Sequence, residues 1–250
     1  MTPTTIKVVV DARKKKNSMV LALAAPSFAA EDIVVGVTPF PHKDIMLAAK
    51  PLLAKEGYNL VIKEFTDYVQ PNMALASKQL FANFFQHEPY LDNMNKEKKL
   101  DLVSIGKVHI EPLGVYSKKI KKLADLKKGN SVSVPNDPTN EARALRLLEA
   151  NGVITIKPGA LVTVADITKN PLGLKFHELD AAQLPRTLDD VTASVINTNF
   201  AGEAGLVPSR DALVMEGSES PYANIIVVRN EDKDSPKAKA LMKTSRGVGR

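Results

Sequence analysis

The sequence of 250 residues contains no cysteine and no tryptophan. Without cysteine, disulfide bonds, thiolate catalysis and cysteine-ligated zinc are all excluded. The chain also lacks low-complexity tracts and any repeat with a period of roughly 20–50 residues, which argues against a disordered chain and against a solenoid. With 44% hydrophobic and 25% charged residues it has ordinary globular composition. Its length suits one large domain or two lobes of about 100 residues each.

The motifs of the common enzyme classes are missing as well. There is no GxSxG elbow, GxxxxGK[ST] phosphate loop, GxGxxG fingerprint or HExxH helix. The four histidines are far apart, and none has a second histidine or a carboxylate at a metal-binding helical interval: His42, His87, His109 and His177. Each is interpreted as a hydrogen-bonded structural residue. We therefore expect no enzyme activity, no cofactor and no metal.

The net charge of +6 comes from the two ends of the chain. Residues 1–30 carry a net +4 and residues 237–250 a net +5, which leaves −3 for the residues between them. Duplex nucleic acid requires a cationic surface that releases counterions. A mildly acidic body cannot supply it, so nucleic acid is not an expected partner.

Residues 1–30 have the pattern of an export signal. Arg13–Lys16 forms a cationic region, Met19–Ala30 is a short apolar run, and Ser27–Ala29 places small residues where signal peptidase needs them. The apolar run is too short to span a bilayer. A buried N-terminal helix is the alternative, which Pro26 and the preceding lysines disfavour.

Short runs of β-branched residues alternate with segments of helical spacing along the remaining chain. Strands are predicted at 33–37, 60–62, 102–105, 113–116, 131–134, 163–167, 174–176, 188–191, 193–196 and 225–228. Helices are predicted at 44–55, kinked or divided by Pro51, at 71–80, at 124–126 and from Asp137 to Gly152. This alternation predicts an α/β protein with mostly parallel sheets.

Aromatic residues gather in one segment, between Glu64 and Asn93. Five of the chain's thirteen phenylalanines and tyrosines are interleaved there with amides and a histidine: Tyr68, Phe81, Phe84, Phe85 and Tyr90. An apolar slot with a few converging polar groups suits a small amphiphilic ligand. The mixture has no clean period of two or 3.6, so a ligand pocket and a core stripe both remain open.

Polar groups follow several predicted strands. Arg143 lies in the first two turns of the helix after Asp137, where the helix dipole and a guanidinium favour a carboxylate. The alternative is a surface pair between Arg143 and Glu141 or Asp137.

Amides provide the rest of this polar inventory. Asn197 and Asn199 end one strand, and Asn224 leads into another. Amides accept from an ammonium and donate to a carboxylate. Together with the aromatic segment, these groups would suit a zwitterion with an apolar side chain, namely an amino acid.

Seven segments resemble the NlpA (MetQ-type) family, the methionine-binding proteins of bacterial methionine ABC importers. They are GYNLVIKEFTDYVQPN, ANFFQHEPYLDN, LVSIGKVHIEPLGVYS, PNDPTNEARALRLLE, AAQLPRTLDDV, VINTNFA and SPYANIIVVR, and they span about residues 33–236 in order. The resemblance implies a two-lobed periplasmic-binding-protein fold, type II-like, with the ligand cleft between the lobes. The implied division is 31–112 plus 225–250 for lobe 1 and 113–224 for lobe 2, after the signal-like residues 1–30.

The resemblance also implies the site residues. Tyr68, Phe85, His87 and Tyr90 would enclose the thioether of methionine, and Arg143 would take its carboxylate. Asn199 and Asn224, with Asn197 as a weaker candidate, would hold the amino and carboxylate groups. The implied partners are L-methionine, possibly also D-methionine, and the ABC permease with its ATPase.

Two departures from the family pattern stand out. Family members typically carry a lipid-bearing cysteine after the signal, and because this chain has no cysteine we expect a freely soluble periplasmic form. At the other end, Ala240–Met242 runs into KTSRGVGR, where the family continues with about twenty more helical residues. We therefore expect this tail to be unrelated sequence and lobe 1 to lack a packed helix.

Three other hypotheses of function compete with a role in transport. A protein of the same fold could act as a surface adhesin or a sensor, and an operon without permease and ATPase genes would favour this. An enzyme of two-lobed α/β type has no catalytic constellation to support it. A degraded gene product that folds poorly is suggested by the two unusual ends.

Overall fold

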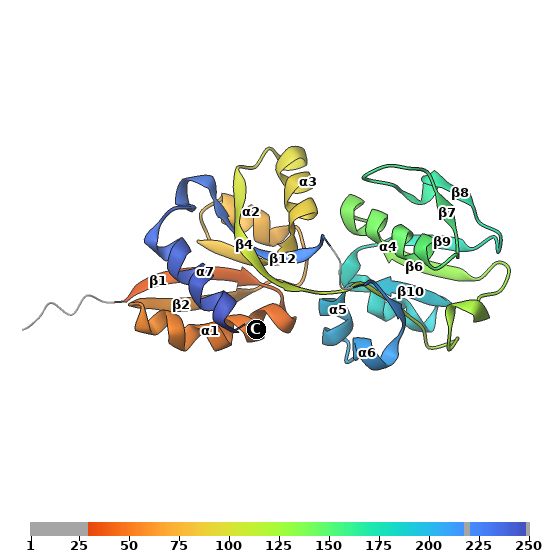
Figure 1. Ribbon diagram of the computed structural model, residues 1–250, viewed down its shortest axis with the longest axis horizontal. Coiled ribbons are helices and arrows are strands. Elements are labelled where there is room, and N and C mark those ends of the chain that lie inside the picture. Colours follow the sequence, from red (N-terminus) through yellow and green to blue (C-terminus); the bar gives the residue numbers. More distant parts are fainter. Residues whose placement is uncertain (1–29, 218–220, 249–250) are drawn as a thin grey trace, which may run out of the picture.

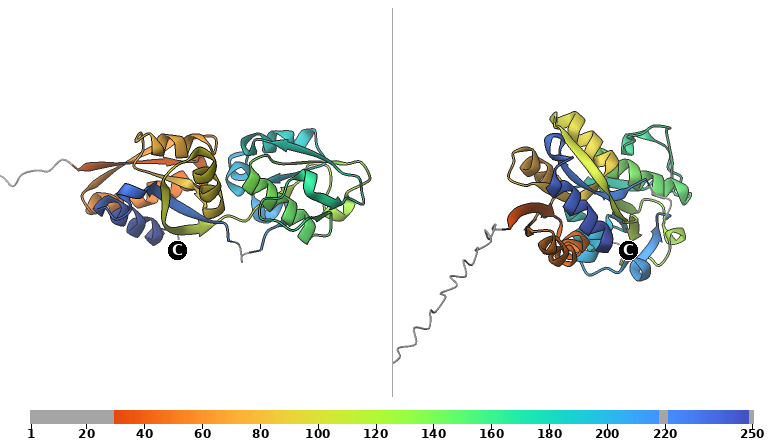
Figure 2. Two further views of the ribbon diagram at one scale, coloured as in Figure 1. Left: turned by 90° about the horizontal axis from the view of Figure 1, so that it is seen from above. Right: turned by 60° about the vertical axis from the view of Figure 1, so that its left-hand side comes forward.

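The computed structural model describes residues 30–217 and 221–248, which form two lobes side by side (Figures 1 and 2). We call lobe 1 the part built on strands β1–β4 and β12, and lobe 2 the part built on β5, β6 and β9–β11. The signal-like segment before residue 30 and Ser220 lie outside the described residues. The arrangement agrees with the predicted two-lobed α/β fold.

Lobe 1 contains a five-stranded sheet in the order β2-β1-β3-β12-β4. Its strands are β1 (Glu31–Val37), β2 (Tyr58–Glu64), β3 (Ala82–His87), β4 (Leu102–Ile110) and β12 (Ala223–Arg229). The pairs β1–β2 and β1–β3 are parallel, whereas β12 is antiparallel to both of its neighbours. Along β12, Ile226 and Val228 join one apolar cluster and Ile225 and Val227 the other, as the period of two along a strand requires.

Helices cover both faces of this sheet (Figure 1). They are α1 (Asp44–Lys55), α2 (Gln70–Ala76), α3 (Glu88–Lys98) and α7 (Pro236–Val248). Side chains of α1 and α7 share one apolar cluster, and those of α2 and α3 share the other. Pro51 lies inside α1 without dividing it, so of the two predicted effects, a kink or a division, the division is wrong. A short irregular turn (Pro39–Lys43), with Phe40 in extended backbone, precedes α1, and a 3-10 turn (Asn230–Asp232) follows β12.

Lobe 2 contains the second five-stranded sheet, in the order β11-β5-β10-β6-β9. Its strands are β5 (Gly114–Tyr116), β6 (Ser131–Pro135), β9 (Lys175–Leu179), β10 (Ala193–Ile196) and β11 (Ala212–Met215). Its other elements are α4 (Pro138–Ala150), α5 (Thr198–Glu203), α6 (Pro208–Asp211), the pair β7 (Thr155–Ile156) and β8 (Ile167–Lys169), and 3-10 turns at Leu123–Asp125, Val164–Asp166 and Ala181–Asp189. The strand β5 is antiparallel to both of its neighbours.

Three expectations about these elements are wrong. The sheets are mixed rather than mostly parallel, because β12 returns into lobe 1 and β5 enters lobe 2 against the direction of their neighbours. The predicted strand 163–167 is mainly a 3-10 turn, since Asp166 accepts from the backbone N–H and the hydroxyl of Thr163. The predicted strand 188–191 begins inside the 3-10 segment that contains Pro185.

Two chain segments join the sheets. One connects β4, ending at Ile110, with β5, starting at Gly114, and the other connects β11 with β12. The position of the lobe boundaries at 112/113 and 224/225 stays a prediction. The first of these segments contains Glu111, which borders the space between the lobes where the candidate site lies.

The expectation that the tail after Met242 is unrelated to the fold is wrong for the residues up to Val248. The helix α7 includes the tail residues through Val248, and Thr244 and Ser245 are buried. Leu241 lies in the same apolar cluster as the lobe 1 strands. This part of the tail is therefore integral to lobe 1 and forms one of its packed helices.

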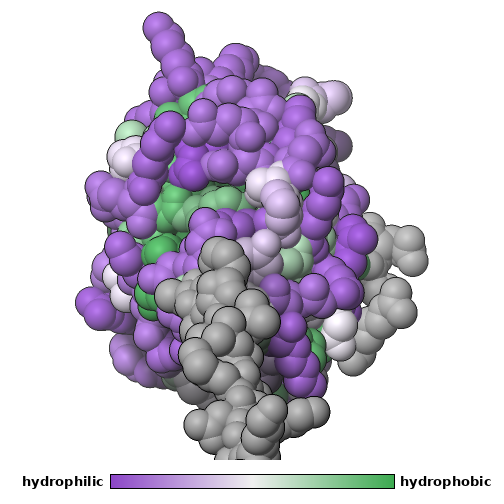
Figure 3. All heavy atoms as spheres, turned by 90° about the vertical axis from the view of Figure 1, so that its left-hand side faces the viewer, coloured by the Kyte–Doolittle hydropathy of each residue, from purple (hydrophilic) through white to green (hydrophobic). Residues whose placement is uncertain are grey.

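The outer end of lobe 1 is mainly hydrophilic, with hydrophobic side chains visible in a hollow between polar ridges (Figure 3). Within residues 30–217 and 221–248, no helix combines the length and apolar character needed to cross a bilayer. The apolar material of the described chain is instead concentrated in the lobe cores.

Candidate ligand-binding site

A cavity lies between the lobes. All eight predicted site residues line it, together with four others: Tyr68, Phe85, Gln86, His87, Tyr90, Glu111, Asn140, Arg143, Asn197, Thr198, Asn199 and Asn224. The fold thus brings together candidates that are spread over more than half of the chain.

One wall of the cavity is aromatic. The ring centroids of Tyr68, Phe85 and Tyr90 are 5.8–6.0 Å apart, and Phe200 of lobe 2 lies 4.9 Å from Tyr68. Phe84, the neighbour of Phe85 on β3, instead belongs to the core of lobe 1. The aromatic segment therefore serves as both pocket and core, because successive β3 side chains point to opposite faces.

Tyrosine hydroxyls connect this wall to its surroundings. The Tyr90 hydroxyl donates to the carbonyl oxygen of Tyr68 at 2.8 Å, and the Tyr68 hydroxyl donates to Asn199 Oδ1 at 2.6 Å. Burial raises the pKa of both tyrosines. Both hydroxyls consequently remain protonated donors.

His87 ends β3 and caps α3. Its Nδ1 accepts from the backbone N–H of Tyr90 at 3.2 Å, so the ring proton resides on Nε2, which donates to Asn140 Oδ1 at 3.2 Å. Burial, reinforced by the charge of Arg143, lowers the pKa of His87 to about 3. The imidazole is therefore neutral and serves as a polar edge of the apolar wall.

Asn140 connects this wall to lobe 2. Its Oδ1 accepts a hydrogen bond from Asn197 Nδ2 at 3.0 Å, and its Nδ2 donates to the carboxylate of Asp137, which caps α4. The Asn197 Oδ1 atom is buried and has no partner among the described residues. A buried acceptor of this kind is a natural partner for a ligand donor.

The Arg143 guanidinium is held by an acidic side chain and a backbone carbonyl. Its Nε and Nη2 donate to the two carboxylate oxygens of Glu216 at 2.7 and 2.6 Å, and Nη2 also donates to the carbonyl oxygen of Glu111 at 2.7 Å. The alternative of a surface pair with Asp137 or Glu141 is wrong. Asp137 caps α4, Glu141 accepts from a backbone N–H, and the Arg143 side chain is only 4% exposed.

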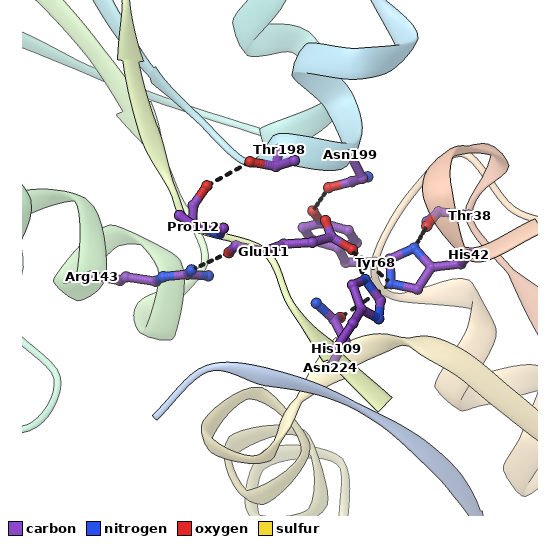
Figure 4. A network of polar contacts seen from close by, with 10 residues as sticks. All are labelled: Thr38, His42, Tyr68, His109, Glu111, Pro112, Arg143, Thr198, Asn199 and Asn224. Carbon is purple, nitrogen blue, oxygen red and sulfur yellow. Dashed lines mark hydrogen bonds and ion pairs between the residues drawn. The ribbon is translucent and has the colours of Figure 1, made fainter. Parts of the chain in front are cut away.

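The carboxylate of Glu111 lies between two histidines (Figure 4). Its Oε1 atom is 2.5 Å from His109 Nε2 and 3.2 Å from His42 Nε2. Asn224 Oδ1 is 3.2 Å from the same His42 nitrogen, and the Thr38 hydroxyl is 2.7 Å from His42 Nδ1. These contacts connect the loop before α1 with β4, the first joining segment and β12.

The protonation states of this cluster follow from burial and charge. Burial lowers the pKa of His42 although Glu111 opposes the shift. Burial alone would raise the pKa of Glu111, but His42, His109 and Arg143 outweigh it and leave the pKa lowered. Glu111 is thus held as an anion between the two histidines.

Glu111 and Glu216 were missed from sequence because their partners lie far away in the chain. The interval of two residues between His109 and Glu111, at the end of a strand, places both side chains on one side and was the available signal. His42, His109 and Glu111 each offer one ligand atom, and these atoms all lie within 4.8 Å of one another. Within the described residues, this is the group that could hold a metal ion.

A buried cavity between two α/β lobes joined by two chain segments defines a two-lobed substrate-binding protein. Residues 33–247 match the NlpA lipoprotein family, and the chain belongs to that family. The match continues past residue 236, where we expected it to stop, and includes most of α7.

Named relatives agree with this assignment. The chain is 47% identical over 228 residues to outer membrane lipoprotein 3 of Mannheimia haemolytica, covering 89% of this chain and 86% of that protein. It is 44% identical over 216 residues to the D-methionine-binding lipoprotein MetQ of Escherichia coli K12, covering 84% and 79%. A nutrient-binding protein from Burkholderia cenocepacia, solved bound to methionine, is 51% identical with a TM-score of 0.84, covering 86% of this chain and 91% of that one.

Proposed function

We propose that this protein is the substrate-binding component of an ABC importer, which captures methionine in the cell envelope and delivers it to a permease and its ATPase. The observation that carries the proposal is an inter-lobe cavity in which an aromatic wall faces charged and amide groups. Methionine-binding relatives and the methionine-bound neighbour support the choice of ligand. They favour transport over a role as adhesin or sensor.

The aromatic wall is the proposed place of the methionine side chain. Tyr68, Phe85 and Tyr90 present ring faces and edges at mutual distances near 6 Å, and the neutral His87 closes the pocket. A thioether gains modestly from contact with aromatic edges beyond ordinary apolar burial. An apolar side chain of methionine length is therefore the preferred occupant.

The polar end is proposed to hold the α-carboxylate and the α-ammonium. Glu216 occupies Nε and Nη2 of Arg143, which leaves Nη1, with the Asn199 and Asn224 amides, for the carboxylate. Glu111 offers a carboxylate to the ammonium. Because Glu111 also contacts Arg143 through its carbonyl oxygen, the two ligand charges would lie beside one residue.

Contacts between the lobes support capture by hinge closure. Tyr68 of lobe 1 contacts Asn199 of lobe 2, and the Thr198 hydroxyl donates to the Pro112 carbonyl oxygen in a joining segment at 2.5 Å. Groups that line the cavity thus also connect the lobes. A ligand that adds contacts to both sides selects the closed state.

Calorimetric titration of ligand-stripped protein with L-methionine tests the proposal. We expect one-to-one binding, weaker binding of norleucine, which lacks the sulfur, and none of 3-(methylthio)propionate, which lacks the ammonium. Glu111→Gln should lower affinity about 30-fold or more, equivalent to about 2 kcal/mol. The matched control Glu97→Gln, on the exposed face of α3, should bind normally.

Absence of heat from a cooperatively folded sample would overturn methionine as the ligand. Equal affinity for methionine and the des-amino analogue would instead remove Glu111 from the site while leaving the side-chain pocket in place.

A further inference from the structure

The cluster of His42, His109 and Glu111 contains more potential ligand atoms than the binding of an amino acid requires. Two imidazoles and one carboxylate converge from the loop before α1, the end of β4 and the first joining segment. Their side chains are 1%, 16% and 9% exposed. A single ammonium requires the carboxylate alone, so the pair of histidines needs a further explanation.

We propose that His42, His109 and Glu111 form a binding site for a divalent transition metal of the zinc type. Two histidines and one glutamate are an established zinc ligand set, with a fourth position left for another donor. Asn224 Oδ1, 3.2 Å from His42 Nε2, or a water molecule can occupy that position.

The distances are compatible with a metal after small movements. Zinc bonds of about 2.1 Å in tetrahedral geometry place ligand atoms about 3.4 Å apart. Glu111 Oε1 is 3.2 Å from His42 Nε2 and 2.5 Å from His109 Nε2, and no pair in the cluster exceeds 4.8 Å. Shifts of at most about 1.4 Å therefore convert the hydrogen-bonded cluster into a coordination sphere.

The surroundings of the two imidazoles suit this conversion. The Thr38 hydroxyl lies 2.7 Å from His42 Nδ1, where it can accept a hydrogen bond from the Nδ1–H once Nε2 binds the metal. Such a contact beyond the ligands fixes the tautomer at zinc sites. His109 Nδ1 has no partner among the described residues, so the His109 ring can change tautomer without breaking another hydrogen bond.

The metal and the amino acid would exclude each other, because both need the Glu111 carboxylate. This part rests on the proposed function. Saturating methionine should weaken metal affinity, and zinc should weaken methionine affinity by the same factor, since the coupling between two ligands is reciprocal.

Cobalt titration of tag-free, chelator-treated protein in the absence of methionine tests the site by itself. We expect one Co²⁺ per chain with the intense visible bands of tetrahedral coordination. His109→Gln and His42→Gln should each weaken binding more than about 100-fold, and Thr38→Val about tenfold. His177→Gln, an exposed histidine on β9, should bind like the wild type.

A second measurement does not depend on variants that could misfold. X-ray absorption of the zinc-loaded wild type should show two imidazoles and one or two oxygen donors. Only the faint spectrum of octahedral Co²⁺, tetrahedral bands that persist in His109→Gln, or fewer than two imidazoles around zinc would overturn the proposal. Methionine binding without a cobalt signal would contradict the metal site but not the proposed function. A cobalt signal without methionine binding would contradict the proposed function but not the metal site.

Discussion

The Tyr68 hydroxyl of lobe 1 donates a hydrogen bond of 2.6 Å to Asn199 Oδ1 of lobe 2. The Tyr68 ring also belongs to the aromatic wall, 5.8 Å from Phe85. One side chain thus combines two roles: it lines the cavity and connects the lobes. The two roles can be separated, because removing the hydroxyl leaves the ring in place.

Tyr68→Phe should weaken methionine binding about fivefold without unfolding the protein. The lost hydrogen bond contributes about 1 kcal/mol to the closed state, while the apolar contacts of the ring remain. Calorimetry measures the change, and Tyr58→Phe on β2 is the matched control. Unchanged affinity in Tyr68→Phe would mean that this contact does not stabilise the closed state.

Gly202→Ala should also impair closure. A Cβ atom at this position on α5 would overlap the ring of Phe40, which precedes α1 in the other lobe. We expect at least a tenfold loss of methionine affinity, and recovery of most of it in the double variant Phe40→Ala/Gly202→Ala. Gly247→Ala on α7, where a Cβ atom meets nothing within 4 Å, is the control. Failure of the double variant to recover would contradict a steric cause.

Stability should fall as the pH drops below about 6.5. His87 has its pKa lowered to about 3, and burial lowers that of His42 as well. Between the folded and unfolded pKa values the unfolded chain binds the extra proton, so the free energy of unfolding decreases with falling pH. Each histidine contributes a slope of up to about 1.4 kcal/mol per pH unit.

Urea unfolding at pH 7, 6, 5 and 4 measures this slope. His87→Gln should reduce the slope between pH 6 and 4, whereas the exposed His177→Gln should not. Parallel pH profiles for the wild type and His87→Gln would show that His87 is not held neutral by the fold.

Glu216→Gln should lower the free energy of unfolding by about 3 kcal/mol, because it leaves the buried Arg143 charge without its carboxylate. The exposed pair Lys243–Glu56 provides the comparison: Glu56→Gln should cost no more than about 1 kcal/mol. Denaturant unfolding of both variants measures the difference. Equal effects would mean that the Arg143–Glu216 pair is solvated.

Sequence patterns predicted the long, strongly apolar elements and the cavity wall. The strands around Val35 and Ile226 and the Asp137-capped helix occur where expected, because burial or capping decides them locally. The strand predicted near Leu188 failed, since a 3-10 segment that contains Pro185 replaces it. Short elements such as α5 and α6 lack a periodic signal of their own.

The site shows the same division between local and distant causes. The eight predicted lining residues belong to recognisable motifs. Glu216 and His42 lie outside these motifs. His109 and Glu111 lie inside one of them, but their arrangement depends on the contact with His42, which only the fold creates. Arg143 illustrates the limit: its position was predicted, but its partner lies 73 residues away.

A crystal structure of the protein with L-methionine tests the central claim most directly. The account predicts electron density for one methionine between the lobes, with its thioether among Tyr68, Phe85 and Tyr90. Its ammonium should lie within hydrogen-bonding distance of Glu111, and its carboxylate at Arg143. Methionine found outside this cavity, or inside it with the charged groups turned toward the aromatic wall, would contradict the account.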